Sequence, residues 1–211
     1  MEEFEIIGGC LLTVCLEVIG LRLAAGEIEE KFSRKVAMVM SGIQVVLMLI
    51  LWLGCGKESF MVLKYLVMTA LLGICAWSDW KKHLILNHTL LAGIILRILL
   101  IAGEFLYYGV DEWKFILTSA AVAAVMFLIA SLLCKVVATQ GVGFGDVKLL
   151  FVFGLYAGTD MGIQIIFITF VILFAVAVFL LITKRATRKS VIPFAPFLYA
   201  GAIASVIMLG I

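Results

Sequence analysis

The sequence predicts an all-α membrane protein whose chain crosses the bilayer about eight times. Hydrophobic residues make up 65% of its 211 residues, charged residues only 14%, and the mean hydropathy is +1.24. Soluble domains are closer to half apolar and a quarter charged. A soluble domain of this length could not bury so much apolar surface, so we expect lipid to surround most of the side chains.

Eight apolar runs define the predicted helices. A helix rises about 1.5 Å per residue and must cross a hydrocarbon layer of about 30 Å. The sixth run is short by this measure, and we expect it to begin below the membrane surface. Only loops separate the runs, so residues 1–211 are predicted to form a single transmembrane domain. The runs are 4–23, 36–54, 60–77, 84–102, 115–138, 147–158, 162–183 and 191–211.

Basic residues lie mainly in the connections on one side of this predicted bundle. The positive-inside rule assigns the more basic side to the cytosol, which places both termini outside. The outer connections carry only Lys57, Lys64 and Lys114. The inner connections carry Lys31, Arg34, Lys35, Lys81, Lys82, Lys135, Lys148, Lys184, Arg185, Arg188 and Lys189.

Net charge and cysteine spacing argue against several classes of function. The net charge is +2 and no basic stripe with interleaved aromatic residues occurs, so we expect no nucleic-acid partner. The five cysteines lie in or beside apolar runs and never form a C-x-x-C pair. We expect them to be small buried hydrophobic residues, with no disulfide framework, metal site or cofactor. The N-terminus lacks the basic region of a signal peptide, so the first span is expected to be retained.

Two of the four aspartates lie at the predicted cytosolic ends of spans. Asp79 ends the third run and Asp146 opens the sixth, whereas Asp111 and Asp160 fall in outer connections. Two carboxyl groups that approach closely share one proton, so one can accept a proton from water while the other donates one. The pair therefore predicts acid–base hydrolysis without a metal. The alternative is that both are ordinary helix ends, with Asp146 capping the helix that follows it.

Three alternating glycines precede this second aspartate, at Gly141, Gly143 and Gly145. Such a density is costly unless the backbone adopts positive φ or passes very close to another chain. A helix cap needs only one glycine, whereas an extended substrate lying beside the carboxylate would use all three. We therefore predict an active-site loop that contains Gly143, Gly145 and Lys148 beside Asp146.

The stretch GFGDVKLLFVFGLYAG resembles the GxGD signature of the bacterial type IV prepilin peptidases, which are intramembrane aspartic proteases. IPFAPFL, at residues 192–198, resembles the Ile-Pro-Phe-Gly-Pro-Phe element that opens the family's last span. The resemblance covers residues 76–198 and implies that Asp79 and Asp146 are the catalytic pair. In the family, the first aspartate begins an Asp-x-basic-x-x-x-Ile-Pro-Asn element, whose matching positions here are Asp79, Lys81, Ile85 and Asn87.

The chain also departs from the family pattern. Leu86 stands where the family usually has proline, and Ala195 replaces a glycine between Pro193 and Pro196. Many members carry a sizeable cytosolic loop after the first span, with paired cysteines suited to zinc. Here that connection is only AAGEIEEKFSRK. We therefore expect no separate zinc or methyltransferase loop, and the sequence does not predict N-methyltransferase activity.

The resemblance implies an aspartic endopeptidase that removes the basic leader of type IV prepilin-like precursors. It implies the bacterial inner membrane as the location, a cytosolic active site, and the precursors and the bilayer as partners. Two other classes stay open: a proton-coupled transporter, in which Asp79 and Asp146 relay protons, and a non-catalytic pilus-assembly protein. A relay should have ionisable groups stepping across the membrane, whereas both aspartates are predicted on one side.

Two further charged residues lie inside predicted spans. Arg97, in the outer half of the fourth span, requires snorkelling or a buried partner. Glu17, in the first span, is costly unless it faces protein or a wet cavity. For Glu17 the sequence leaves two interpretations open: a contact for the substrate's new amino terminus, or a structural acid that is hydrogen-bonded or paired with Arg22.

Overall fold

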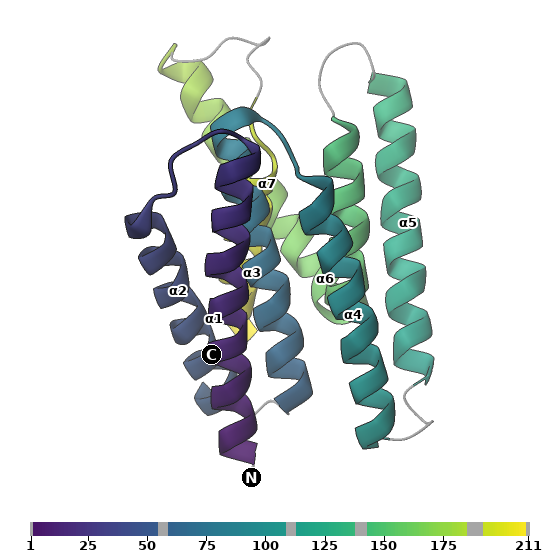
Figure 1. The fold of residues 1–211 in the computed structure, drawn as a ribbon. Helices are drawn as coiled ribbons and strands as arrows, with labels where there is room; N and C mark the ends of the chain where they lie inside the picture. Colours follow the sequence, from purple (N-terminus) through teal and green to yellow (C-terminus); the bar gives the residue numbers. More distant parts are fainter. Residues whose placement is uncertain (1, 55–58, 109–112, 138–142, 185–191, 210–211) are drawn as a thin grey trace.

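The computed structural model describes residues 2–54, 59–108, 113–137, 143–184 and 192–209. Within these residues the secondary structure is helical, with no strand. The helices lie side by side in one bundle (Figure 1). They are α1 Glu2–Glu27, α2 Arg34–Leu49 with its π-helical extension η1 Ile50–Gly54, α3 Ser59–Lys82, α4 Asn87–Tyr108, α5 Trp113–Val137, α6 Phe144–Ile182 and α7 Ala195–Leu209.

Most of these helices have the length and composition of membrane spans. Among the described residues, five stretches are long and apolar enough to cross a bilayer. They are Ile6–Glu27, Arg34–Leu53, Phe60–Lys82, Asn87–Tyr107 and Met161–Ile182, and two shorter apolar helices are Ile116–Ile129 and Ala195–Met208. The chain is therefore an all-α polytopic membrane protein, which confirms the predicted fold class.

The helix α6 is a hairpin of two helical segments. Gly158, near its middle, has φ 61° and ψ −160°, a conformation that residues with a Cβ rarely adopt. Figure 1 shows the second half of α6 returning towards the end of the bundle from which the first half came. Leu150 and Ile166, from opposite halves, accordingly line the same pocket. Counting these halves separately, the seven α-helices of the described residues form eight helical segments, in agreement with the eight apolar runs.

The first half of α6 begins earlier than its apolar run predicts. The helix starts at Phe144 rather than Val147, because Gly143 serves as its N-cap in an extended conformation, with φ −72° and ψ 143°. Asp146 therefore lies inside the first turn of the helix, not ahead of it.

Two other helices begin later than predicted. The helix α4 starts at Asn87, so residues 84–86 form a non-helical connection after α3. The helix α7 starts at Ala195 and has Pro196 in its first turn, where a missing N–H breaks no helical hydrogen bond. The start of α7 lies beside Asp79.

The helix α3 occupies the centre of the bundle. It packs against α1, α2, α4, α6 and α7. In its candidate span 83% of the residues are buried, compared with 28% or fewer in each of the other four candidate spans. A residue at the end of α3, such as Asp79, is therefore held by elements from both halves of the chain.

Arg97, near the middle of α4, has the buried partners that its position requires. Its side chain is fully enclosed, with Nη1 at 3.0 Å from Glu104 Oε1. Its Nε donates to the Leu155 carbonyl at 2.9 Å, and its guanidinium lies 5.9 Å from the centre of the Tyr156 ring. In a continuous helix the Leu155 carbonyl would accept from the N–H four residues later, beyond the reversal at Gly158. Arg97 therefore caps the end of the first half of α6.

Candidate active site

Asp79 lies at the end of α3 and binds the start of α7. Its Oδ2 accepts a hydrogen bond of 2.9 Å from the Ala195 backbone N–H, and the Phe194 backbone also donates to the carboxyl group. The residue is 5% exposed. Because a helix N-terminus favours a negative group, the hydrogen bond from Ala195 favours the carboxylate form of Asp79 and fixes its orientation, while the burial of the side chain opposes that form.

Asp146 is the third residue of α6 and is half-buried. Its carboxyl group accepts a hydrogen bond from the backbone N–H of Gly143, and its own N–H donates to the Gly143 carbonyl at 3.0 Å. A carboxylate at this position that reaches back to the N-cap N–H is one half of a capping box. The N-cap is thus Gly143, and the interpretation of Asp146 as the cap is wrong.

The two carboxyl groups interact electrostatically. Asp146 precedes the apolar part of its helix, and burial together with the negative charge of Asp79 raises its pKa to about 6. The hydrogen bond from Gly143 lowers this pKa and so offsets part of the rise. The structure therefore brings together the two aspartates that the sequence analysis paired, and a proton shared between them is more stable on Asp146 than it would be on an isolated aspartate.

Two contacts join the segment that follows Asp79 to the segment around Asp146. A Cβ built on Gly145 would lie only 3.3 Å from Ile85 Cβ, so the connection between α3 and α4 runs close over the start of α6. Lys148 Nζ donates to Asn87 Oδ1 at 2.9 Å and lies 5.1 Å from the ring centre of Phe144. Lys148 is therefore a positioning residue between α4 and α6.

The structure describes two of the three glycines that precede Asp146, and the passage of a substrate beside them stays a prediction. Gly143 is extended, and a Cβ there would meet Asp146 Oδ2 only at 3.7 Å. Neither Gly143 nor Gly145 has positive φ; among the described glycines Gly158 does. Close approach therefore explains Gly145, but its partner is Ile85 of this chain. Gly141 lies outside the described residues.

Glu17 is a fully buried acid at some distance from this pair. Among the residues that the structure describes, neither carboxyl oxygen has a hydrogen-bond partner, and Gln44, although close, does not meet the distance and angle of a hydrogen bond. Gly73 provides the space, since a Cβ there would lie 2.9 Å from Glu17 Oε1. Arg22 is instead exposed and stacks on Phe32 at 5.7 Å. Pairing with Arg22, one form of the interpretation of Glu17 as a structural acid, is therefore not found.

The remaining predicted residues divide between those the structure describes and those it does not. Cys10 and Cys75 are buried as expected, but Cys15 is exposed, so the prediction is wrong for that cysteine. In the part of the chain that the structure describes, no group of three or more His, Cys, Asp or Glu side chains is arranged to hold a metal ion. Asp111 and the side chain of Asp160 lie outside the described residues.

Residues 66–180 match the type IV leader peptidase family. The chain belongs to this family. The matched stretch is more than half of the 211 residues and contains both aspartates. No curated protein and no solved structure matches the chain. This leader peptidase family member is therefore a helical membrane peptidase.

The match ends before α7, whose first residue, Ala195, donates the hydrogen bond to Asp79. Sequence analysis named Ala195 only as a departure from a family element and assigned it no contact. The signal that could have found this contact is IPFAPFL itself, because two prolines that flank a helix start predict exposed backbone N–H groups there.

Proposed function

We propose that this peptidase is an aspartic endopeptidase whose catalytic pair is Asp79 and Asp146. The observation that supports the proposal is that two aspartates far apart in the sequence lie close enough, at one end of the bundle, for the charge of Asp79 to act on Asp146. The structural contacts of each, to Ala195 and to Gly143, use backbone N–H groups and leave the carboxyls able to exchange a proton.

In the proposed reaction, the Asp79 carboxylate takes a proton from water as the water oxygen attacks the peptide carbonyl carbon. Asp146, whose pKa is raised to about 6, donates its proton to the carbonyl oxygen. The tetrahedral intermediate then breaks its C–N bond. The proton held by Asp79 passes to the departing amine, and one hydroxyl of the intermediate returns a proton to Asp146 as the new carboxylic acid forms. No group other than the two carboxyls and water is needed.

The proposed substrate is the family's: a type IV prepilin-like precursor, cut after a glycine between its basic leader and its apolar helix. We place the reaction at the cytosolic face of the bacterial inner membrane. Lys and Arg are more frequent in the connections at the end of the bundle that holds Asp79 and Asp146, which supports this orientation.

Purified peptidase in detergent, incubated with a purified prepilin, tests the proposal directly. Mass spectrometry should find the leader and a mature chain that begins at the predicted junction. Added chelator should not change the rate, because no metal takes part. Folded peptidase that leaves every offered precursor intact would contradict the assignment.

Alanine at Gly145 should slow this cleavage, whereas alanine at Gly143 should not. The methyl at Gly145 forces Ile85 aside and separates the segments that hold the aspartates, at a cost of about 1 to 3 kcal/mol. That cost corresponds to a loss of about tenfold to a hundredfold in single-turnover rate per folded molecule. Gly143 has an allowed φ, and a Cβ there would make only ordinary contacts of 3.7 Å or more, so it serves as the matched control. Equal rates for both variants would contradict the role of the Ile85 contact.

Glu17→Gln should leave the cleavage rate unchanged and leave the unfolding temperature equal or higher. The amide keeps the shape of the side chain but removes an ionisable group that is buried without a partner. If Glu17 were paired with Arg22, the same substitution would remove an ion pair and should lower the unfolding temperature. Differential scanning fluorimetry in detergent measures the change, and Glu17→Ala, which leaves a cavity, is the control for lower stability. A loss of cleavage at unchanged stability would instead support a contact with the substrate.

A further inference from the structure

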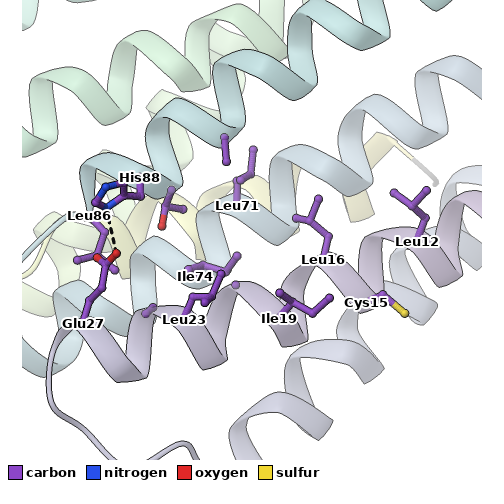
Figure 2. Close-up of a pocket in the computed structure, with 14 residues that line it drawn as sticks. Leu12, Cys15, Leu16, Ile19, Leu23, Glu27, Leu71, Ile74, Leu86 and His88 are labelled. Carbon is purple, nitrogen blue, oxygen red and sulfur yellow. Dashed lines mark ion pairs between the residues drawn. The ribbon is translucent and has the colours of Figure 1, made fainter.

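An apolar groove runs along the membrane-facing side of the bundle between α1 and α4, with α3 as its floor. Figure 2 shows its lining side chains, and its volume is about 730 Å³. Leu12, Leu16 and Leu23 form the α1 wall, while Leu71 and Ile74 of α3 form the floor. The proposed hydrolysis by the two aspartates does not use this groove.

The groove has the length of a membrane helix. Its lining on α1 extends from Leu12 to Glu27, sixteen residues whose Cα atoms span roughly 22 Å at the rise of an α-helix. That distance is most of the hydrocarbon thickness of about 30 Å. Its lining is almost entirely apolar until the final turn of α1. A guest that fills it lengthwise therefore lies across the bilayer, parallel to α1 and α4.

One end of the groove is charged, and this end is next to the aspartate pair. There Glu27 Oε1 lies 2.9 Å from His88 Nδ1, and both side chains are exposed (Figure 2). Leu86 lines the groove at the same end. The residue before it, Ile85, contacts Gly145 of the catalytic segment. The apolar groove thus leads to a polar mouth formed by Glu27 and His88, and the connection that lines this mouth also contacts Gly145, the neighbour of Asp146.

We infer that this groove holds the apolar helix of the precursor, with the basic leader passing over Glu27. The inference rests on the proposed function. A segment within lipid must satisfy its own backbone groups, so the precursor arrives as a helix and enters sideways from the bilayer. The bond to be cut lies just ahead of that helix, which brings it to the mouth where the two aspartates are. The Glu27 carboxylate complements the positive leader, and lipid chains fill the groove when no precursor is bound.

The exposed thiol of Cys15, part of the groove lining, provides the first test. In an Asp146→Asn background with the other four cysteines replaced, Cys15 is oxidised with precursors that carry one cysteine at successive helix positions. We expect disulfides at positions three and four residues apart, on one face and at one depth of the precursor helix. A matched protein whose single cysteine is Leu117→Cys, exposed on α5, should form none. Equal crosslinking of both proteins, or none by Cys15, overturns the inference.

A second test fills the groove. Ala92, exposed on α4 one turn below His88, lines the groove, and Ala92→Trp should obstruct it. Ala102→Trp, on the exposed surface of the same helix but not in the groove lining, is the control. We expect Ala92→Trp to lower kcat/KM for the full precursor about tenfold or more, the usual cost of overpacking an apolar contact. Cleavage of a short peptide that spans the junction but lacks the apolar helix should be unchanged.

The two substrates separate failure of the groove from failure of the proposed function. Wild-type peptidase that cleaves neither substrate refutes the proposed function, and the groove inference with it. If wild type cleaves both, and Ala92→Trp cleaves the precursor as fast as Ala102→Trp does, the inference about the groove alone is overturned. Equal losses on precursor and short peptide also overturn it, because they would report damage to the active site.

Discussion

Asp79→Asn and Asp146→Asn should each reduce cleavage by at least about a thousandfold while the protein stays folded. The reaction needs one carboxylate and one carboxylic acid together, and an amide can replace neither. The structural contacts survive the change: an amide oxygen at position 79 still accepts from the Ala195 N–H, and one at position 146 still accepts from Gly143. The loss is therefore chemical rather than structural.

Single-turnover cleavage of one prepilin by equal amounts of monodisperse protein measures the effect. Glu30→Gln is the matched control, because Glu30 is an acid at the same end of the bundle whose contact, 3.9 Å to Lys82, is weak and partly exposed. Its rate should stay near that of the wild type. Appreciable turnover by either aspartate variant would rule out the paired mechanism.

Arg97→Met should cause a large loss of stability, about 3 to 5 kcal/mol. Methionine fills a similar volume, but it leaves the Glu104 carboxylate buried without its partner and the Leu155 carbonyl without its donor. Reversible unfolding in mixed micelles, followed by circular dichroism, measures the change. Arg22→Met makes the same substitution at an exposed arginine and should stay within about 0.5 kcal/mol of the wild type.

The double variant Arg97→Met/Glu104→Met separates the two causes. It removes the stranded carboxylate and should recover part of the loss, since a buried ion pair can often be replaced as a whole. The deficit that remains should be about 1 to 3 kcal/mol, the cost of the unsatisfied Leu155 carbonyl. Wild-type stability in the single variant would show that Arg97 does not cap α6.

Sequence patterns predicted the helices well because their cause is local. Lipid requires long apolar stretches, and each run of such residues can be read directly from the chain. Even the division of α6 was visible, since the sixth run ends at Gly158, where the backbone reverses. The start of α6 was misplaced because Gly143 and Phe144 are not distinguished by hydropathy from the loop before them.

The partners of the buried charged residues and of the proposed catalytic residues were less predictable because they are distant in the sequence. That Arg97 needs a buried partner follows from its span, but its contact with the Leu155 carbonyl requires knowing that two helices cross there. The aspartate pair was found because charge asymmetry placed both residues at one end. The contact between Gly145 and Ile85 depends on how the connection between α3 and α4 packs over the start of α6. No periodicity in the sequence predicts such a contact.

The hydrogen bond from Ala195 to Asp79 also bears on how the enzyme returns to its starting state after each turnover. When Asp79 takes a proton from water in the proposed reaction, the N-terminus of α7 loses the negative charge beside it. A helix end stabilises such a charge by about 0.3 to 1 kcal/mol, so α7 opposes keeping the proton on Asp79. The last helix thus favours rapid transfer of that proton to the departing amine and restores the carboxylate for the next precursor.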